Sequence, residues 1–235
     1  MAVFAAYAFN EGGGTTVTDY SGNGRNMTIS GTNSWVAGKY YPFAFQAGAS
    51  GSDGAIWNNG SAIAALSGDV TVQLWYQHTT TSNTISHAGG LYSSPGTSRL
   101  SVYSWRNRPA GVISSSPHAT LRDSASTIFD AGVNGTSTDS SWHNVAWIYH
   151  SNGTIDEYLD GTLLSPAVSP TTTNPIGTTV VEIGAGSSLS GALAQAAVQD
   201  MRIFDTALTG SDVTKYMNTP VYTAPPQVLY QMRSM

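Results

Sequence analysis

Short strand-like runs separated by tight-turn signals are the feature of this sequence that most constrains its fold. The clearest stretch is "SWHNVAWIYHSNGTIDEYLDGTLLSP", residues 141–166. Two dipeptides inside it, Asn152-Gly153 and Asp160-Gly161, permit the positive φ angles that tight hairpin turns require. The stretch therefore predicts a three-stranded meander.

Similar runs recur along the chain with turn residues between them. In the run Val70–His78, alternate residues from Val70 to Tyr76 are apolar, and those between them are polar except for Trp75. Strands of this kind suit two stacked antiparallel sheets, so the sequence predicts an all-β sandwich. The predicted strands are Val3–Phe9, Met27–Ser30, Tyr41–Gln46, Val70–His78, Leu100–Trp105, Gly111–Ser114, Ser126–Phe129, Trp142–His150, Thr154–Leu159, Val180–Gly184 and Gln199–Phe204.

The stretch "QDMRIFDTALTGSDVTKYMN" (199–218) predicts one strand followed by one short helix. Val213, Tyr216 and Met217 lie three and four residues apart, and Thr209 or Ser211 is a suitable N-cap. Residues 1–219 contain no internal repeat or linker, so we predict a single domain there.

The remaining residues, Pro220–Met235, combine three prolines with apolar side chains in "TPVYTAPPQVLYQMRSM" (219–235). Proline discourages regular structure, whereas the Val, Leu and Tyr side chains favour contact with another surface. We expect an extended C-terminal arm that docks on a partner.

The composition excludes several classes of protein. Only 10% of the residues are charged, well below the roughly 25% of a typical soluble domain. The 9 Lys and Arg residues and the net charge of −5 argue against nucleic-acid binding, which needs clustered basic residues. No apolar run approaches the roughly 18 residues of a membrane span. Cys is absent, which excludes disulfides and thiolate metal sites.

Four segments resemble laminin-G-like, concanavalin A-like jelly-roll domains. They are "YAFNEGGGTTVTDYSGNGRNMTISG", "SWHNVAWIYHSNGTIDEYLDG", "VEIGAG" and "DMRIFDTALTGSDVTKYM", which follow one another in the family's order over residues 7–217. The resemblance implies an antiparallel jelly roll that ends in one short helix. It leaves the function open, because this fold hosts lectins, glycosidases, adhesion modules and virion proteins.

The segment "DYSGNG" is a candidate calcium loop. Asp19, Ser21 and Asn23 alternate before Gly24, as in the first half of many calcium loops. An EF-hand is excluded because Ser30 stands where the bidentate Glu belongs. Since the resemblance implies that the first and last strands pair, Asp200 is the candidate distant ligand. The alternative is a turn whose side chains bond their own backbone.

The carboxylates do not form a glycosidase pair. Such enzymes hold two carboxyl groups about 5–9.5 Å apart. Asp156 and Glu157 point to opposite faces of a strand, and Asp156 and Asp160 are about 13 Å apart at about 3.3 Å per residue. His143 and His150 are also too far apart to share a metal ion. We therefore predict a protein that is not an enzyme and keep a jelly-roll glycoside hydrolase as an alternative.

Aromatic residues beside amides predict two sugar-binding positions, because a pyranose offers an apolar face and a polar rim. The alternatives are that these aromatic side chains belong to the core, or that they contact another protein. The candidate residues are Trp57, Asn58 and Asn59 in one segment, and Trp105, Arg106 and Asn107 in the other.

A bacteriophage virion surface protein is the function that we predict first. The resemblance implies it, since such domains occur in phage tail and capsid-surface proteins, and "MAVFAAYAFNEGGG" lacks the basic n-region of a signal peptide. We expect synthesis in the host cytoplasm and attachment through both termini to virion proteins or symmetry mates, as a homo-oligomer or otherwise, with loops that touch host glycans. The second hypothesis is a lectin-like carbohydrate-binding module.

Overall fold

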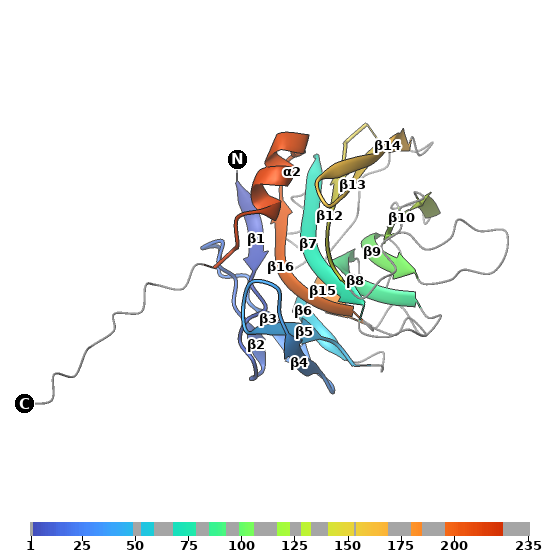
Figure 1. Ribbon diagram of the computed structural model, residues 1–235. Helices are drawn as coiled ribbons and strands as arrows, with labels where there is room; N and C mark the ends of the chain where they lie inside the picture. The colour runs from blue at the N-terminus through green and yellow to red at the C-terminus, as the bar shows by residue number, and fades with distance from the viewer. Residues whose placement is uncertain are drawn as a thin grey trace, which may run out of the picture.

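Two antiparallel sheets lie face to face, and one short helix covers the outer face of one sheet (Figure 1). The structure is a computed structural model. It describes residues 2–48, 53–58, 68–78, 85–92, 99–105, 117–122, 128–132, 141–152, 154–168, 180–184 and 196–222. The predicted all-β sandwich is confirmed.

The sheet that carries the helix is called sheet A. Its strands are β1 (Val3–Tyr7), β4 (Ser34–Ala37), β5 (Phe43–Gln46), β7 (Val70–His78), β12 (Trp142–Tyr149), β13 (Ile155–Leu159), β14 (Thr162–Val168) and β16 (Ala196–Phe204). Their order is β14-β13-β12-β7-β16-β5-β4, and β1 pairs with β16 beside this path. The predicted meander corresponds to β12, β13 and β14.

The opposite sheet is called sheet B. Its strands are β2 (Thr16–Val17), β3 (Met27–Ser30), β6 (Gly54–Asn58), β8 (Ile85–Tyr92), β9 (Arg99–Trp105), β10 (Pro117–Arg122), β11 (Ile128–Gly132) and β15 (Val180–Gly184). Their order is β11-β10-β9-β8-β15-β6-β3-β2. The strand predicted at Gly111–Ser114 lies outside the described residues.

Apolar side chains fill the space between the sheets. The apolar face predicted for β7, from Val70 to Tyr76, belongs to this core, and Trp147 of β12 is its largest fully buried side chain. Burying a large apolar side chain stabilises a fold by about 1.5–3 kcal/mol. Alternation along the strands therefore both forms the elements and drives their packing.

Helix α2 (Gly210–Met217) packs on the outer face of sheet A and buries Val213 against Ile148 and Phe204. Thr209 is its N-cap, and it forms a capping box with Asp212. Because α2 covers this face, the polar side of β7 is buried as well. Within the described residues, no helix has both the length and the hydrophobicity that a membrane span requires.

Candidate binding site at the end of helix α2

A bulge in β16 creates the centre of the candidate site. The pairing of β16 with β7 shifts register between Gln199 and Arg202. Asp200, inside this bulge, has a φ of 55° and donates its backbone N–H to the carbonyl of Ala8. A positive φ is uncommon for a residue with a side chain, and Asp tolerates it better than most. The bulge turns a carboxylate toward the outer face of sheet A, below α2.

The Asp200 carboxylate forms a buried ion pair with Arg202. The Arg202 Nη1 and Asp200 Oδ1 atoms are 2.8 Å apart, and the exposed fractions of the two side chains are 7% and 1%. Burial raises the pKa of Asp200 to about 6, although Arg202 and the amide of Val221 act in the opposite direction. Burial also lowers the pKa of Arg202. The site thus contains two charges that have lost most of their hydration.

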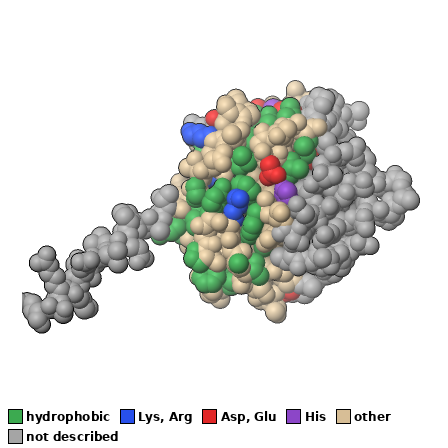
Figure 2. Space-filling model, viewed as in Figure 1, with side chains coloured by type: hydrophobic (Ala, Val, Ile, Leu, Met, Phe, Trp, Pro, Cys, Tyr) green, Lys and Arg blue, Asp and Glu red, His purple; other side chains and the backbone are tan. Residues whose placement is uncertain are grey.

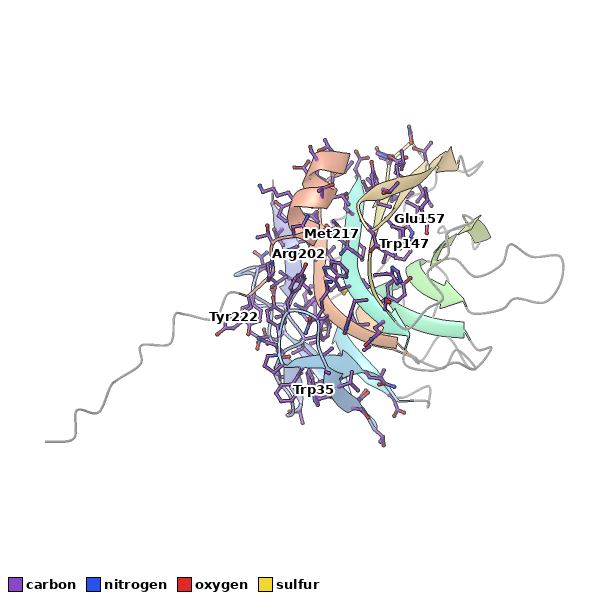
Figure 3. All side chains as sticks on the ribbon, viewed as in Figure 1. Trp35, Trp147, Glu157, Arg202, Met217 and Tyr222 are labelled. Carbon is purple, nitrogen blue, oxygen red and sulfur yellow. The ribbon has the colours of Figure 1, made fainter. Side chains whose placement is uncertain are left out.

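These two charges hold the chain that follows α2. The Val221 N–H donates to both Asp200 oxygens, at 3.3 and 3.1 Å. Arg202 donates to the carbonyl of Tyr216 at 3.1 Å and to the carbonyl of Thr219. Figure 3 shows Arg202 near the chain that leads from Met217, at the end of α2, to Tyr222.

The loop at residues 39–41 approaches from the other side. Gln199 Oε1 accepts the N–H groups of Lys39 and Tyr40, at 2.9 and 2.8 Å. The Tyr41 hydroxyl donates to Asp200 Oδ2 at 3.5 Å and accepts the N–H of Tyr222 at 2.9 Å. Strand β16 therefore organises both the loop and the segment after α2.

The side chains that meet at this point form a surface that we call the tyrosine surface, made of Tyr20, Tyr41 and Tyr222. The ring centroids of Tyr20 and Tyr222 are 5.1 Å apart, and those of Tyr41 and Tyr222 are 6.3 Å apart. Tyr20 is 39% exposed and the other two are half-buried. Three distant parts of the chain thus place aromatic rings together at the surface.

A cation borders the tyrosine surface. Tyr40 contacts Tyr41 at a ring distance of 6.4 Å, and Lys39 Nζ lies 4.0 Å from the ring centroid of Trp75. Trp75 is 7% exposed, and its indole N–H donates to the carbonyl of Met217 at 3.3 Å. Trp75 is therefore support, whereas the tyrosines are open to a ligand. Figure 2 shows hydrophobic side chains on this face, with a Lys or Arg side chain among them.

The candidate calcium loop has internal partners for its oxygens. Asp19 Oδ1 accepts from the N–H groups of Ala6 and Ser21, and Oδ2 accepts from the Ser21 hydroxyl and the Arg25 N–H, all within 3.0 Å. Asn23 turns its amide N–H₂ group to the carbonyl of Phe4, at 3.1 Å. These bonds are those of the turn alternative.

The predicted distant ligand, Asp200, serves the ion pair and the Val221 amide. The structure does pair the first and last strands, β1 and β16, as the resemblance implies. In the described ranges, no three His, Asp or Glu side chains converge in a way that suits a metal ion. Calcium binding stays a prediction.

The first predicted sugar position centres on Trp57 of β6. Its ring packs against the core, with the edge of Phe4 at a centroid distance of 6.0 Å and the Arg25 guanidinium 5.5 Å from its centroid. Trp57 is half-buried. Asn59 lies outside the described residues, and only the backbone of Asn58 is described.

The second predicted sugar position lies almost wholly outside the described part of the chain. Arg106 and Asn107 are not described, and Trp105 is described only as the last residue of the β9 backbone. These residues stay predictions.

The carboxylates of the β12–β13 hairpin point away from each other. Asp156 pairs with His150 at 3.0 Å, whereas Glu157 is buried opposite Trp147 (Figure 3). Asp160 adopts a φ of 49° in the turn and bonds His143 at 2.8 Å. The predicted separation of these acids is confirmed by their directions.

Sequence reasoning missed the tyrosine surface. Tyr20, Tyr41 and Tyr222 are about 20 and 180 residues apart along the chain, and only the meeting of β1, β16 and the segment after α2 unites them. The nearest signal was the pattern Asp200-x-Arg202, which places two opposite charges in one closing strand. A buried pair needs partners, and here the partners are backbone groups of the following segment.

Solved structures with the same fold include binding domains of botulinum neurotoxins. The serotype G binding domain has a TM-score of 0.67 and 14% identity, covering 92% of this chain and 50% of that chain. The serotype DC binding domain, in complex with rat synaptotagmin II, has a TM-score of 0.69 and 16% identity, with coverages of 92% and 51%. A third structure is titled as type C neurotoxin entry that depends on two ganglioside molecules; its TM-score is 0.64 and its identity 18%, with coverages of 91% and 51%. The chain thus spans about half the length of these structures.

No curated protein sequence matches the chain. A family model does match residues 49–214, under the description Concanavalin A-like lectin/glucanases superfamily. This match covers most of the chain and agrees with the two-sheet sandwich and its closing helix. The chain therefore belongs to the laminin-G-like branch of the Concanavalin A-like lectin/glucanases superfamily.

Proposed function

We propose that this protein is a lectin-like binding module that recognises carbohydrate through the tyrosine surface and does not act as an enzyme. The observation that carries the proposal is the convergence of Tyr20, Tyr41 and Tyr222 at one partly exposed place. A tyrosine ring stacks on the apolar face of a sugar, while its hydroxyl reaches the polar rim. Hydrogen bonds from β16 hold the surface in shape, which lowers the entropy cost of binding.

Polar groups around the tyrosines suit a hydroxyl-rich ligand. Tyr20 has the Asn10 side chain as a hydrogen-bond partner and Glu11 nearby, and exposed Lys39 borders the opposite end. Amides, carboxylates and ammonium groups beside aromatic rings provide the orienting contacts of small-ligand sites. Relatives of the same fold support this class of ligand, since one title names gangliosides.

A glycan array tests the proposal. The protein and a Tyr20→Ala variant are applied to an array of immobilised oligosaccharides, with Leu163→Ala as the control. Leu163 is 45% exposed on β14, at the far edge of sheet A, so its loss removes apolar surface elsewhere. We expect the protein and the control to be retained and Tyr20→Ala retention to fall about tenfold, as for an aromatic contact of about 1–1.5 kcal/mol. Equal retention of all three, or of none, contradicts the proposal.

The arrangement of acids supports a binding role over hydrolysis. Asp156 is engaged by His150 and Glu157 is directed to the interior, whereas a glycosidase needs two carboxyl groups that face one bond. Incubation of the oligosaccharides that bind best should leave their chain lengths unchanged in mass spectra. The appearance of shorter products would revive the glycoside hydrolase alternative.

We further propose that the module is displayed on a bacteriophage virion, as a capsid decoration or minor tail component. The observation that favours this role is the anchoring of Val221 and Tyr222 at the ion pair, which gives the arm beyond them a defined starting point. An arm that begins at a fixed place is suited to attachment to virion proteins or symmetry mates. Immunogold labelling of particles released from the producing cells tests this role, and unlabelled particles would contradict it.

A further inference from the structure

We propose that Asp200, Arg202 and the Tyr41 hydroxyl are positioning residues for the binding surface, because they clamp segment 219–222 and thereby hold Tyr222 between Tyr20 and Tyr41. The inference rests on the proposed function, since it assigns the residues that complete the same surface. These three groups are called the clamp. The carbohydrate surface then exists only while the segment after α2 is attached to β16.

The clamp is the main connection between this segment and the sheet. Residues 219–222 lie beyond α2 and form no strand. Their backbone instead bonds side chains: Val221 N–H to Asp200, Thr219 carbonyl to Arg202, and Tyr222 N–H to Tyr41. Side-chain bonds of this kind fix a segment that has no ladder of its own.

The burial of the ion pair explains why the segment is held firmly. A buried pair is stable only when further hydrogen bonds satisfy its remaining atoms. The backbone of 216–221 supplies those bonds to both Asp200 and Arg202. Detaching the segment would therefore leave two poorly hydrated charges with fewer partners, and this cost opposes opening.

The Tyr41 hydroxyl joins the clamp to the binding surface. It donates to Asp200 at 3.5 Å and accepts from Tyr222 N–H at 2.9 Å, while the Tyr41 ring contacts the Tyr222 ring. Tyr222 in turn provides the ring next to exposed Tyr20. A change to the hydroxyl alone should loosen Tyr222 without removing any ring from the surface.

The Tyr41→Phe variant makes this change, and Tyr158→Phe is the matched control. Tyr158 is half-buried on β13, where its ring lies near Gly210, so the control removes a phenol hydroxyl away from the clamp. Two measurements are made on the full chain: the hydrogen-exchange protection of the Tyr222 amide, and retention on the glycan array. We expect Tyr41→Phe to lower both protection and retention about fivefold, as for the loss of one hydrogen bond. The control should change neither.

The two measurements separate the possible failures. Unchanged protection in Tyr41→Phe would overturn the clamp itself. Lower protection with unchanged retention would show a real clamp that does not serve the surface, and would overturn the positioning role. If the unaltered protein is not retained on the array, the proposed function fails and the positioning role fails with it, while the exchange data still report whether the clamp exists.

Discussion

At the scale of single residues, two aspartates in similar sequence settings have opposite environments. Asp19 is surrounded by donors from Ala6, Ser21 and Arg25, so its charge is solvated by the protein. Asp200 faces one cation in a buried place, and burial dominates its pKa. The difference decides which of them responds to metal and which to pH.

Calcium should have little effect on this protein. A cation at Asp19 would have to displace the N–H and hydroxyl groups that already occupy both carboxylate oxygens. We therefore expect no shift of the melting temperature when millimolar calcium replaces EDTA, because only a ligand of the folded state raises it. A rise in the protein that is absent from Asp19→Ala would instead establish the calcium site.

Asp200 should make the stability depend on pH between about 4 and 6. Its folded pKa of about 6 exceeds the ordinary value of 3.8, so the folded state binds the proton more tightly than the unfolded state. This contribution is fully present below about pH 4 and is lost as the pH rises through 6; the raised pKa corresponds to about 2–3 kcal/mol. Arg202, Tyr40 and Tyr41 are the ionisable groups that face it.

Urea unfolding of the protein and of Asp200→Asn at pH 4.5 and pH 7 measures this contribution. The free energy of unfolding of the protein, taken relative to the variant, should be larger at pH 4.5 than at pH 7. The comparison removes the effect of carboxylates with lowered pKa, such as Asp69, which acts in the opposite direction in both proteins. A difference that stays constant or grows with pH would contradict the assignment.

At the scale of elements, helix α2 is held by its cap and by one buried amide pair. Gln73 donates to the carbonyl of Val213 at 2.9 Å and to Asn144 at 2.8 Å, which joins β7, β12 and α2. The helix has 8 residues, too few to be stable in isolation. Its position over β16 therefore depends on these contacts, and the clamp depends on its position.

Removal of the cap should destabilise the fold. Thr209 Oγ1 accepts the Asp212 N–H, and Asp212 returns a bond to the Thr209 N–H. We expect Thr209→Ala to lower the free energy of unfolding by about 1 kcal/mol. Thr214→Ala, an exposed change inside the same helix, is the control and should cost nothing, because Ala has the higher helix propensity. Equal effects of the two changes in chemical denaturation would contradict the capping role.

The elements themselves were readable to different degrees. Strands β3, β7 and β15 match their predicted bounds, since alternation or β-branched runs mark them. Strand β8 was missed because Gly89 and Gly90 interrupt its pattern, and the short edge strand β4 gives too few residues for a period. The cap at Thr209 was predicted because a capping box is local in sequence.

At the scale of the whole molecule, the binding surface is a product of topology. β1 and β5 pair with different ends of β16, and the segment after α2 returns to the point between them. Tyr20, Tyr41 and Tyr222 arrive there from separate parts of the chain, so no local pattern could predict them together. The sequence did predict the two-sheet fold, because periodicity is repeated in many strands and needs no knowledge of long-range contacts.

Two shortened chains should separate the surface from the arm. A chain that ends at Tyr222 keeps the clamp and all three tyrosines, so its glycan retention and free energy of unfolding should equal those of the full chain. A chain that ends at Asn218 loses the partners of Asp200 and Arg202 as well as Tyr222. Its free energy of unfolding should fall by about 2 kcal/mol, because hydrogen bonds to charged groups are lost, and its retention should disappear.

Attachment to particles gives the matching measurement for the arm. If residues 223–235 anchor the module, the chain that ends at Tyr222 should bind glycans and yet fail to sediment with virions, whereas the full chain should do both. The two activities would then lie on either side of Tyr222: recognition on the clamped side and attachment beyond it. Sedimentation of the shortened chain with particles would assign anchoring to the domain itself, and loss of glycan retention in that chain would place part of the surface beyond Tyr222.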